Sequence, residues 1–217
     1  YQVSDRITVL RNGGFVGCRE TRELPQIELV KMMLGRELDT HALQRAGRTL
    51  LSDKPVAAFS GFGKKGTIAP FDLQVRPGEI VGLAGLLGSG RTETAEVIFG
   101  IKPADSGRAL IKGKPQTLRS PHQASCLGIG FCPEDRKTDG IIAAASVREN
   151  IILALQAQRG WLRPIPRKEQ NEIAERFIRQ LGIRTPNAEQ PIEFLSGGNQ
   201  QKVLLSRWLL TKPQFLI

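Results

Sequence analysis

The sequence predicts an α/β fold in which a mostly parallel sheet is accompanied by an antiparallel β portion and a helical subdomain. Three observations predict this fold. From residue 55 onward, short apolar runs of strand length alternate with longer runs of helical period. A glycine-rich turn, "GLLGSGRT" at residues 85–92, lies between one such strand and one such helix. A second glycine motif, in "LSGGNQQK" at residues 195–202, opens another predicted helix.

Residues 1–35 are expected to form a small unit, followed by a polar linker without periodicity at 36–54. Two β-patterned runs flank Asn12-Gly13, which is a strong hairpin signal. A run of helical spacing follows, and Gly35 is suited to end it. The expected bounds are 6–10 and 15–17 for the strands and 27–34 for the helix.

The unit at 55–217 begins with strands that lead into the glycine turn. An alternating run predicts a strand at 67–75, and the Arg-Pro-Gly sequence after it predicts a turn. The apolar run at 80–84 is short and begins with β-branched residues, which is typical of a buried parallel strand. It continues through the glycine turn into a helix that Gly100 closes.

Downstream, the sequence predicts a helical subdomain over about 146–200. Ser146 and Glu149 form an S-x-x-E capping box that opens a helix. In the next helix, Ile173, Phe177 and Leu181 share one face, a stripe more typical of core packing than of a cofactor site. The remaining expectations are strands at 109–111 and 128–131, a helix closed by Gly182, a helix over 199–210 and a strand-like run at 212–217.

Composition limits the classes of function. A chain of 217 residues with 40% hydrophobic content is long enough for one or two domains with a sizeable core. Its formal net charge of +10 is compatible with nucleic acid, an anionic membrane surface or a phosphorylated ligand. The basic residues are spread along the chain and diluted by glutamates, so we expect a solvated basic surface in preference to a dedicated polyanion groove.

Cysteine usage and the longest apolar runs indicate the compartment. The 3 cysteines show no C-x-x-C spacing, which argues against a disulfide framework or a zinc site and fits a reducing compartment. No apolar run approaches the about 20 residues that a membrane span needs. The chain opens on Tyr1 without a signal pattern and closes on "KPQFLI" without a cap, so both ends are expected to be cuts through a longer protein.

The turn at 85–92 matches the phosphate-binding pattern G-x-x-x-x-G-K-[ST], except that Arg91 stands at the lysine position. Its glycines tolerate the backbone angles that wrap N–H groups around phosphate oxygens at a helix N-terminus. Thr92 offers a hydroxyl to Mg²⁺, and Arg91 offers a permanent positive charge. On its own, such a turn can also be a simple tight bend. The candidate nucleotide-binding residues are Gly85, Leu86, Leu87, Gly88, Ser89, Gly90, Arg91 and Thr92.

A second candidate anion site lies at Ser196, Gly197 and Gly198. Their position before a helical run places a hydroxyl and two bare backbone amides at a helix N-terminus. Two sites of the same physical kind in one α/β chain support each other. Together they favour a nucleotide-binding protein over a chance glycine turn.

The motif "LSGGNQQK" resembles the signature L-S-G-G-Q of ATP-binding cassette (ABC) ATPases, with Asn199 in place of the glutamine. The order of "GLLGSGRT", "PEDR", "SVRENI" and this motif follows the cassette order of Walker A, Q-loop, helical subdomain and signature. "GEIVGLAGLLGSGRTE", "PEDRKTDGII" and "LSGGNQQKV" together resemble the second cassette of the fused two-cassette ATPases of bacterial sugar importers. The galactofuranose type is the most similar, with ribose, xylose, arabinose and galactose importers as relatives.

This resemblance implies a P-loop NTPase fold and a division of the chain into three parts. "SDRITVLRNGGFVG" is similar to the last β-hairpin of a first cassette, so residues 1–35 would be the end of that cassette, 36–54 a linker and 55–217 an incomplete second cassette. A complete cassette continues with a Walker B aspartate, a catalytic glutamate, a D-loop and a switch histidine. The resemblance therefore places the end of this chain before Walker B.

The resemblance also implies roles for single residues. Residues 85–92 would be the Walker A loop, and arginine in place of its lysine is typical of second cassettes in this family. Glu134 lies near the Q-loop glutamine that links Mg²⁺ and the attacking water to the transmembrane partner. Ser196, Gly197 and Gly198 would contact the γ-phosphate of ATP that the opposite cassette holds.

The implied cofactors are ATP and Mg²⁺, with Thr92 as the metal ligand. The implied function is to couple ATP binding and hydrolysis to sugar uptake, with the Arg91 site as the less active of two and this chain alone expected to be inactive. The implied partners are a second cassette in a head-to-tail pair, transmembrane permease subunits and, indirectly, a periplasmic sugar-binding protein. They would place the protein on the cytoplasmic face of the bacterial inner membrane.

Two other functions stay open at this point: a soluble ABC-type ATPase of nucleic-acid metabolism, and a basic nucleic-acid-binding module. Aromatic residues are only 6% of the chain, so stacking platforms for bases are scarce and nucleic acid is not the expected partner. His41 and His122 precede the signature in polar sequence and are expected to be surface or capping residues. Phe62 is a candidate for adenine stacking, with a packing role as the equal alternative.

Overall fold

The structure is a computed structural model that describes residues 1–11, 14–35, 52–160 and 162–217. The chain divides into two compact units, Tyr1–Thr49 and Leu50–Ile217, which are described separately below. The predicted hairpin turn at Asn12-Gly13 lies outside the described residues, as do His41 and most of the predicted linker. No helix of the described part is long and apolar enough to cross a membrane.

The first unit is a β-hairpin with one helix. Strand β1 (Arg6–Arg11) pairs antiparallel with β2 (Gly14–Glu20), and a short 3-10 turn leads to α1 (Gln26–Leu34). Gly35 ends the helix in the left-handed conformation, with φ of 67°, and its N–H donates to the carbonyl of Lys31. The predicted hairpin strands, the helix and its glycine stop are all confirmed.

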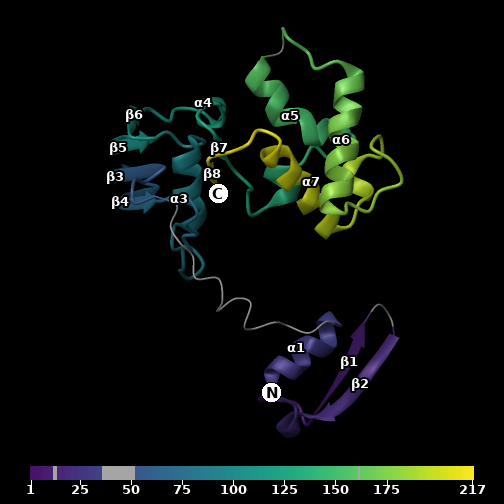
Figure 1. The fold of residues 1–217 in the computed structure, drawn as a ribbon. Helices are drawn as coiled ribbons and strands as arrows, with labels where there is room; N and C mark the ends of the chain where they lie inside the picture. The colour runs from purple at the N-terminus through teal and green to yellow at the C-terminus, as the bar shows by residue number, and fades with distance from the viewer. Residues whose placement is uncertain (12–13, 36–51, 161) are drawn as a thin grey trace. The chain divides into compact units, whose positions relative to one another are not determined.

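The second unit contains a β lobe built on a four-stranded antiparallel sheet in the order β4-β3-β5-β6 (Figure 1). Its strands are β3 (Ala57–Lys64), β4 (Ile68–Val75), β5 (Ser106–Ile111) and β6 (Lys114–Gln116). The helices α3 (Arg91–Phe99) and α4 (Pro121–Cys126) complete this lobe. Sequence analysis predicts β4, β5 and α3, but misses β3, β6 and α4. The core includes Phe59, Phe62, Val97 and Ile98, all of which are buried.

The helical lobe consists of α5 (Val147–Arg159), α6 (Arg167–Leu181) and α7 (Gly197–Leu209), which lie together in Figure 1. Ile173 and Phe177 of the predicted α6 stripe are buried in the core of this lobe, and Leu181 packs against it. Gly182 ends α6 in the left-handed conformation, as predicted. In the core between the two lobes, the ring of Phe99 in α3 lies edge-on to Trp208 in α7, with ring centroids 5.4 Å apart.

A buried arginine in α7 fixes the position of α5 and of a one-turn π-helix, η2 (Arg136–Gly140). The Arg207 guanidinium donates to the carbonyl of Asn150 at 2.8 Å, to the side-chain oxygen of Asn150 at 2.9 Å and to the carbonyl of Gly140 at 2.5 Å. Burial lowers the pKa of Arg207 to about 10, so the side chain stays charged at neutral pH. The donors of the Arg207 guanidinium therefore bond to uncharged oxygens of α5 and η2, the two segments that Arg207 joins.

The expected buried strand at 80–84 is not formed, and this is a correction to the sequence analysis. The segment has no strand assignment, and its side chains are exposed: Ile80 is 70% and Leu83 is 48% accessible. A parallel strand is buried only when neighbouring strands flank it, and none of the described strands pairs with this segment. Among the described strands, parallel pairing occurs only between β7 (Ile129–Gly130) and β8 (Phe215–Leu216). The four-stranded sheet is antiparallel, so the predicted mostly parallel sheet is also corrected.

Candidate functional site

The glycine loop leads directly into the N-terminus of α3. Gly88 and Gly90 have φ of 79° and 88°, a backbone conformation that favours glycine. The first helical hydrogen bond runs from the N–H of Thr94 to the carbonyl of Gly90, at 2.8 Å. Gly90, the N-cap residue, has no side chain that could occupy the free N–H groups of the first turn. The loop therefore presents a helix N-terminus that is open to an anion.

Thr92 and Glu134 are brought together although they are far apart in the sequence. The Thr92 hydroxyl donates to Oε2 of Glu134 at 2.7 Å, and both residues are exposed. They line a pocket of about 420 Å³ together with Glu96, Phe131, Pro133, Asp135, Arg136, Lys137 and Asp139. A hydroxyl and a carboxylate oxygen are hard oxygen ligands that suit Mg²⁺. Thr92 therefore fits the predicted metal role, and the Glu134 carboxylate lies beside it. The described residues hold no cluster of three or more His, Cys, Asp or Glu arranged for a metal.

Arg91 is the first residue of α3 and is exposed. Within the part of the chain that the structure describes, its guanidinium forms no salt bridge, so its charge is available to a ligand at this helix end. A guanidinium is a planar fork, whereas the lysine of the usual pattern presents a compact point charge. The loop keeps a positive charge but offers a different contact geometry.

The second candidate site is the N-terminus of α7. Ser196 is the N-cap residue, yet its side chain forms no capping bond to the backbone. Its hydroxyl oxygen instead accepts from Nδ2 of Asn199 at 2.9 Å. The first helical bond is the one from the N–H of Gln200 to the carbonyl of Ser196, at 2.9 Å. Across the described residues, the N–H groups of Gly197, Gly198 and Asn199 have no acceptor, in agreement with the predicted bare amides.

Arg136 lies against this helix end, a contact that sequence reasoning misses. Its Nε donates to Oε1 of Gln200 at 3.2 Å, and a side chain added at Gly197 would meet its guanidinium at 2.5 Å. A side chain at 197 would therefore have to displace the end of the Arg136 side chain. Gly198 differs, because a side chain added there would meet no atom of the described residues within 4 Å.

One short segment connects the surroundings of both sites. Glu134 bonds to Thr92 of the glycine loop, and Arg136, two residues later, bonds to Gln200 of α7. Among the described residues, no hydrogen bond or salt bridge joins Ser196–Gly198 directly to the glycine loop. The two anion sites are thus linked through side chains of this segment and not in direct contact.

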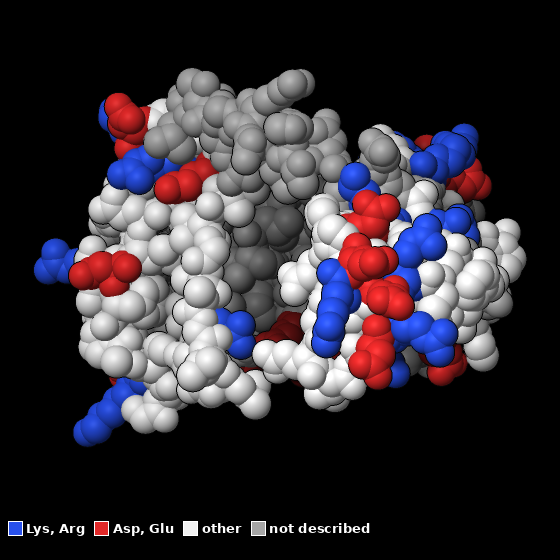
Figure 2. Space-filling view, turned by 90° about the horizontal axis from the view of Figure 1, so that it is seen from below, with Lys and Arg blue, Asp and Glu red and all other residues white. Residues whose placement is uncertain are grey.

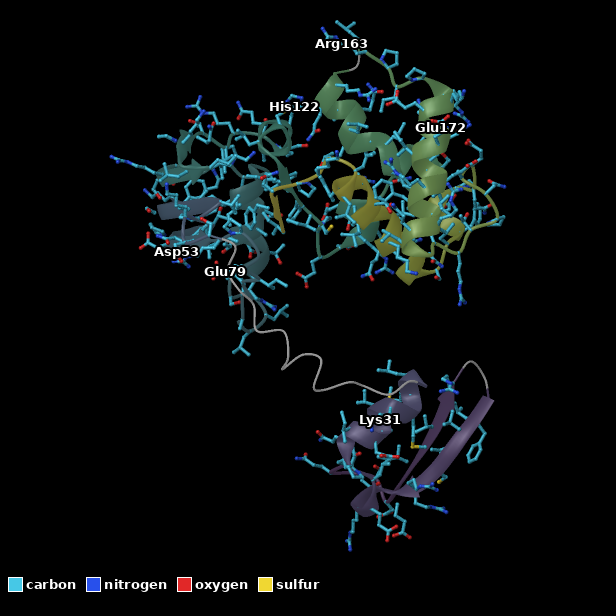
Figure 3. All side chains as sticks on the ribbon, in the orientation of Figure 1. Lys31, Asp53, Glu79, His122, Arg163 and Glu172 are labelled. Carbon is cyan, nitrogen blue, oxygen red and sulfur yellow. The ribbon has the colours of Figure 1, made fainter. Side chains whose placement is uncertain are left out.

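The other candidate residues have structural surroundings. Phe62 is 5% accessible and packs between the rings of Phe59 and Phe71, so it is a core residue and cannot stack on a base. His122, labelled in Figure 3, is exposed on α4, and its Nε2 lies 3.2 Å from the carbonyl of Ala157 in α5. A surface position for His122 was the expectation.

The surface charges are mixed. On the face drawn in Figure 2, the Lys and Arg side chains of the described residues alternate with Asp and Glu side chains and form no continuous basic band. Several basic side chains are also paired: Arg159 with Glu169 at 2.6 Å, and Arg167 with Glu189 at 2.7 Å. This distribution fits a solvated surface better than a polyanion groove.

Comparisons with known proteins agree with the sequence motifs. The family model described as ABC transporter matches residues 68–217. The galactofuranose transporter ATP-binding protein YtfR of Escherichia coli (strain K12) is 94% identical over 217 residues, which are 100% of this chain and 43% of that protein. The fructose import ATP-binding protein FruK of Bifidobacterium longum (strain NCC 2705) is 43% identical over 221 residues, which cover 100% of this chain and 43% of that protein. The chain thus spans less than half the length of these curated relatives.

Solved structures show the same fold. CbiO1 from Clostridium perfringens, part of the ABC transporter complex cbiONQ, matches 76% of this chain and 64% of its own with a TM-score of 0.58 and 20% identity. A nucleotide-free ATP-binding cassette from an ABC transporter matches 75% of this chain and 68% of its own, with a TM-score of 0.61 and 21% identity. At these identities the likeness concerns the fold alone. It confirms the predicted α/β cassette fold.

Proposed function

The chain belongs to the ABC transporter family, and on that basis we propose that it is part of the ATP-binding subunit of a carbohydrate importer. In this proposal the complete subunit couples ATP binding and hydrolysis to sugar uptake. The similarity to a galactofuranose transporter subunit and to a fructose import subunit supports a sugar as the transported substrate. At 94% identity to the former, galactofuranose is the sugar to test first.

The observation that carries the proposal is the open N-terminus of α7. Glycine in a helix interior is roughly 0.5–1 kcal/mol less favourable than alanine, so the two glycines that open α7 do not favour the helix. A side chain at Gly197 would meet the Arg136 guanidinium, whereas a side chain at Gly198 would meet no atom of the described residues within 4 Å. In the proposal, a group from outside the chain occupies the space beside Gly198. The phosphate of a nucleotide held by an opposing cassette has the charge that this helix end favours.

The glycine loop serves as this chain's own nucleotide site in the proposal. Residues 85–92 would hold the phosphates, and Thr92 with Glu134 would hold Mg²⁺, which supplies charge neutralisation when bound. Because Arg91 replaces the lysine, this site would bind ATP weakly, and the chain alone would not hydrolyse it. The site is thus the less active of an unequal pair.

The proposed partners follow from this arrangement. A second cassette in a head-to-tail pair would complete both nucleotide sites, and permease subunits in the membrane would carry the sugar. A periplasmic binding protein would deliver the sugar to the permease. The proposed location is the cytoplasmic face of the bacterial inner membrane, and the proposed domain division stays as 1–35, 36–54 and 55–217.

The test is uptake of labelled galactofuranose, in the presence of the periplasmic binding protein, by vesicles that contain the permease and the full-length subunit carrying this sequence. We expect ATP-dependent uptake that Ser196→Ala reduces by about tenfold or more, since a hydrogen bond to a charged group contributes about 1.5–3 kcal/mol. Ser120→Ala is the matched control, because Ser120 is also an N-cap serine but bonds to the backbone of its own helix, α4. Uptake that is equally insensitive to both substitutions would contradict the proposal.

A second measurement concerns the chain by itself. Single-turnover ATP hydrolysis by the 217-residue chain should not exceed that of the double variant Arg91→Ala, Ser196→Ala. Hydrolysis well above this reference would show that the arginine-containing loop is a competent catalytic site without a partner.

A further inference from the structure

Asn199 occupies the third position of α7, and its amide group is held at both ends. Its Oδ1 accepts from the backbone N–H of Arg184 at 2.9 Å, and its Nδ2 donates to the hydroxyl oxygen of Ser196 at 2.9 Å. A backbone N–H can only donate, so the amide oxygen must face Arg184 and the amine must face Ser196. The orientation of the side chain is therefore fixed by chemistry.

This orientation decides what the Ser196 hydroxyl can do. A hydroxyl has one proton to donate, and its oxygen can accept. In Ser196 the oxygen accepts from Asn199, so the proton is not used by that bond. Ser196 also forms no capping bond to the backbone of its own helix.

We propose that Asn199 is a positioning residue that presents the Ser196 proton to a terminal phosphate oxygen of a nucleoside triphosphate. The inference rests on the proposed function, because it concerns the same helix end. It adds a specific role for the residue that replaces the glutamine of the signature pattern. Ser196 is exposed and Asn199 is half-buried, so the hydroxyl is accessible while the residue that orients it is held in place.

The substitution Asn199→Asp tests this role with little change in shape. An aspartate oxygen can still accept from Arg184, so the anchor of the side chain is kept. Its second oxygen cannot donate, and would take the Ser196 proton that the phosphate needs. A carboxylate in the first turn also favours the helix, through the macrodipole. We therefore expect unchanged or raised thermal stability together with a loss of about 10-fold to 100-fold in kcat/KM for ATP.

The measurement is ATP hydrolysis by the full-length subunit assembled with its permease, over a series of ATP concentrations. Asn187→Asp is the matched control, because Asn187 also accepts a backbone N–H, from Glu189 at 2.9 Å, and the substitution adds the same charge at an exposed site outside α7. The control should retain kcat/KM within about twofold.

A double-mutant cycle separates positioning from a merely structural role. If Asn199 acts through Ser196, then Asn199→Ala reduces kcat/KM in the parent protein but has no further effect once Ser196→Ala is present. Additive losses, or full activity of Asn199→Asp, would overturn the inference while leaving the proposed function intact. Full activity of Ser196→Ala would overturn the proposed function itself, so the two failures are distinguishable.

Discussion

The N-termini of α5 and α7 begin with the same kind of residue and are used in opposite ways. In α5 the Ser146 oxygen accepts the N–H of Glu149 at 3.2 Å, while Glu149 accepts both the N–H and the hydroxyl of Ser146 at 2.8 Å. In α7 the corresponding pair is Ser196 and Asn199, and neither side chain bonds to the backbone of that first turn. One helix end is closed by its own side chains, and the other is left open.

The third residue of each helix decides this difference. An ionised glutamate only accepts, so Glu149 takes the N–H and hydroxyl protons of the N-cap serine and completes a capping box. Asparagine also donates, so Asn199 supplies a proton to its serine instead. Ser146 is 6% accessible whereas Ser196 is exposed, which agrees with a structural role for the first and a ligand-facing role for the second.

The largest expected effect on stability is at Arg148, the second residue of α5. Arg148 in α5 is 2% accessible and bonds to Glu189 at 2.9 Å, to Glu149 and to Gln170. Arg148→Ala is expected to reduce the free energy of unfolding of the helical lobe by about 3 kcal/mol, because it removes a charged donor from this network and leaves a void. Native-state hydrogen exchange of α5 in the full-length subunit measures this change. Protection equal to that of the parent would show that the closed helix end does not depend on the network.

The next largest effect is expected from the two N-cap serines, whose substitution should change the opening free energies of their helices by different amounts. Ser146→Ala removes a capping bond and is expected to lower the opening free energy of α5 by about 1 kcal/mol. Ser196→Ala removes no capping bond, so the opening free energy of α7 should change by less than about 0.5 kcal/mol. Hydrogen exchange of peptides from both helices compares the two variants directly. Equal losses at both serines would contradict the distinction between a closed and an open helix end.

Gly198→Ala should have a smaller effect on stability, and of opposite sign. Alanine is the better helix former, and the added carbon meets no atom of the described residues within 4 Å, so α7 should gain about 0.5 kcal/mol. ATP hydrolysis by the assembled subunit should nevertheless fall, because the methyl group would occupy the space assigned to the nucleotide. Gly197→Ala is the comparison variant, since it meets the Arg136 guanidinium and should lose stability. A stabilised and fully active Gly198→Ala variant would remove the main support for the open helix end.

Local patterns predicted much of the fold and both halves of the candidate site. The capping box at Ser146, the glycine stops and the open end at Ser196 are each decided within a few residues of chain, where propensity and hydrogen bonding act directly. The strand expected at 80–84 was wrong because burial depends on neighbouring strands that its own sequence does not specify. The Thr92–Glu134 and Arg136–Gln200 bonds span 42 and 64 residues, and no local pattern signals such contacts.

Acidification is expected to give the smallest difference between the N-termini of α5 and α7. Hydrogen bonds from the backbone and hydroxyl of Ser146 lower the pKa of Glu149 below its ordinary value of 4.5. A carboxylate with a lowered pKa in the folded state stabilises fully above that ordinary value, and the contribution is lost as the pH falls through the lowered pKa. Asn199 does not titrate, so the open end of α7 has no matching loss. In full-length protein labelled with ¹⁵N-serine, the amide signal of Ser146 should shift with pH in the range below 4.5, and that of Ser196 should shift much less. The Glu149→Gln variant should abolish the Ser146 shift. A persistent shift in that variant would mean that the closed end of α5 titrates through another group, and that the capping box is not what separates the two helix ends.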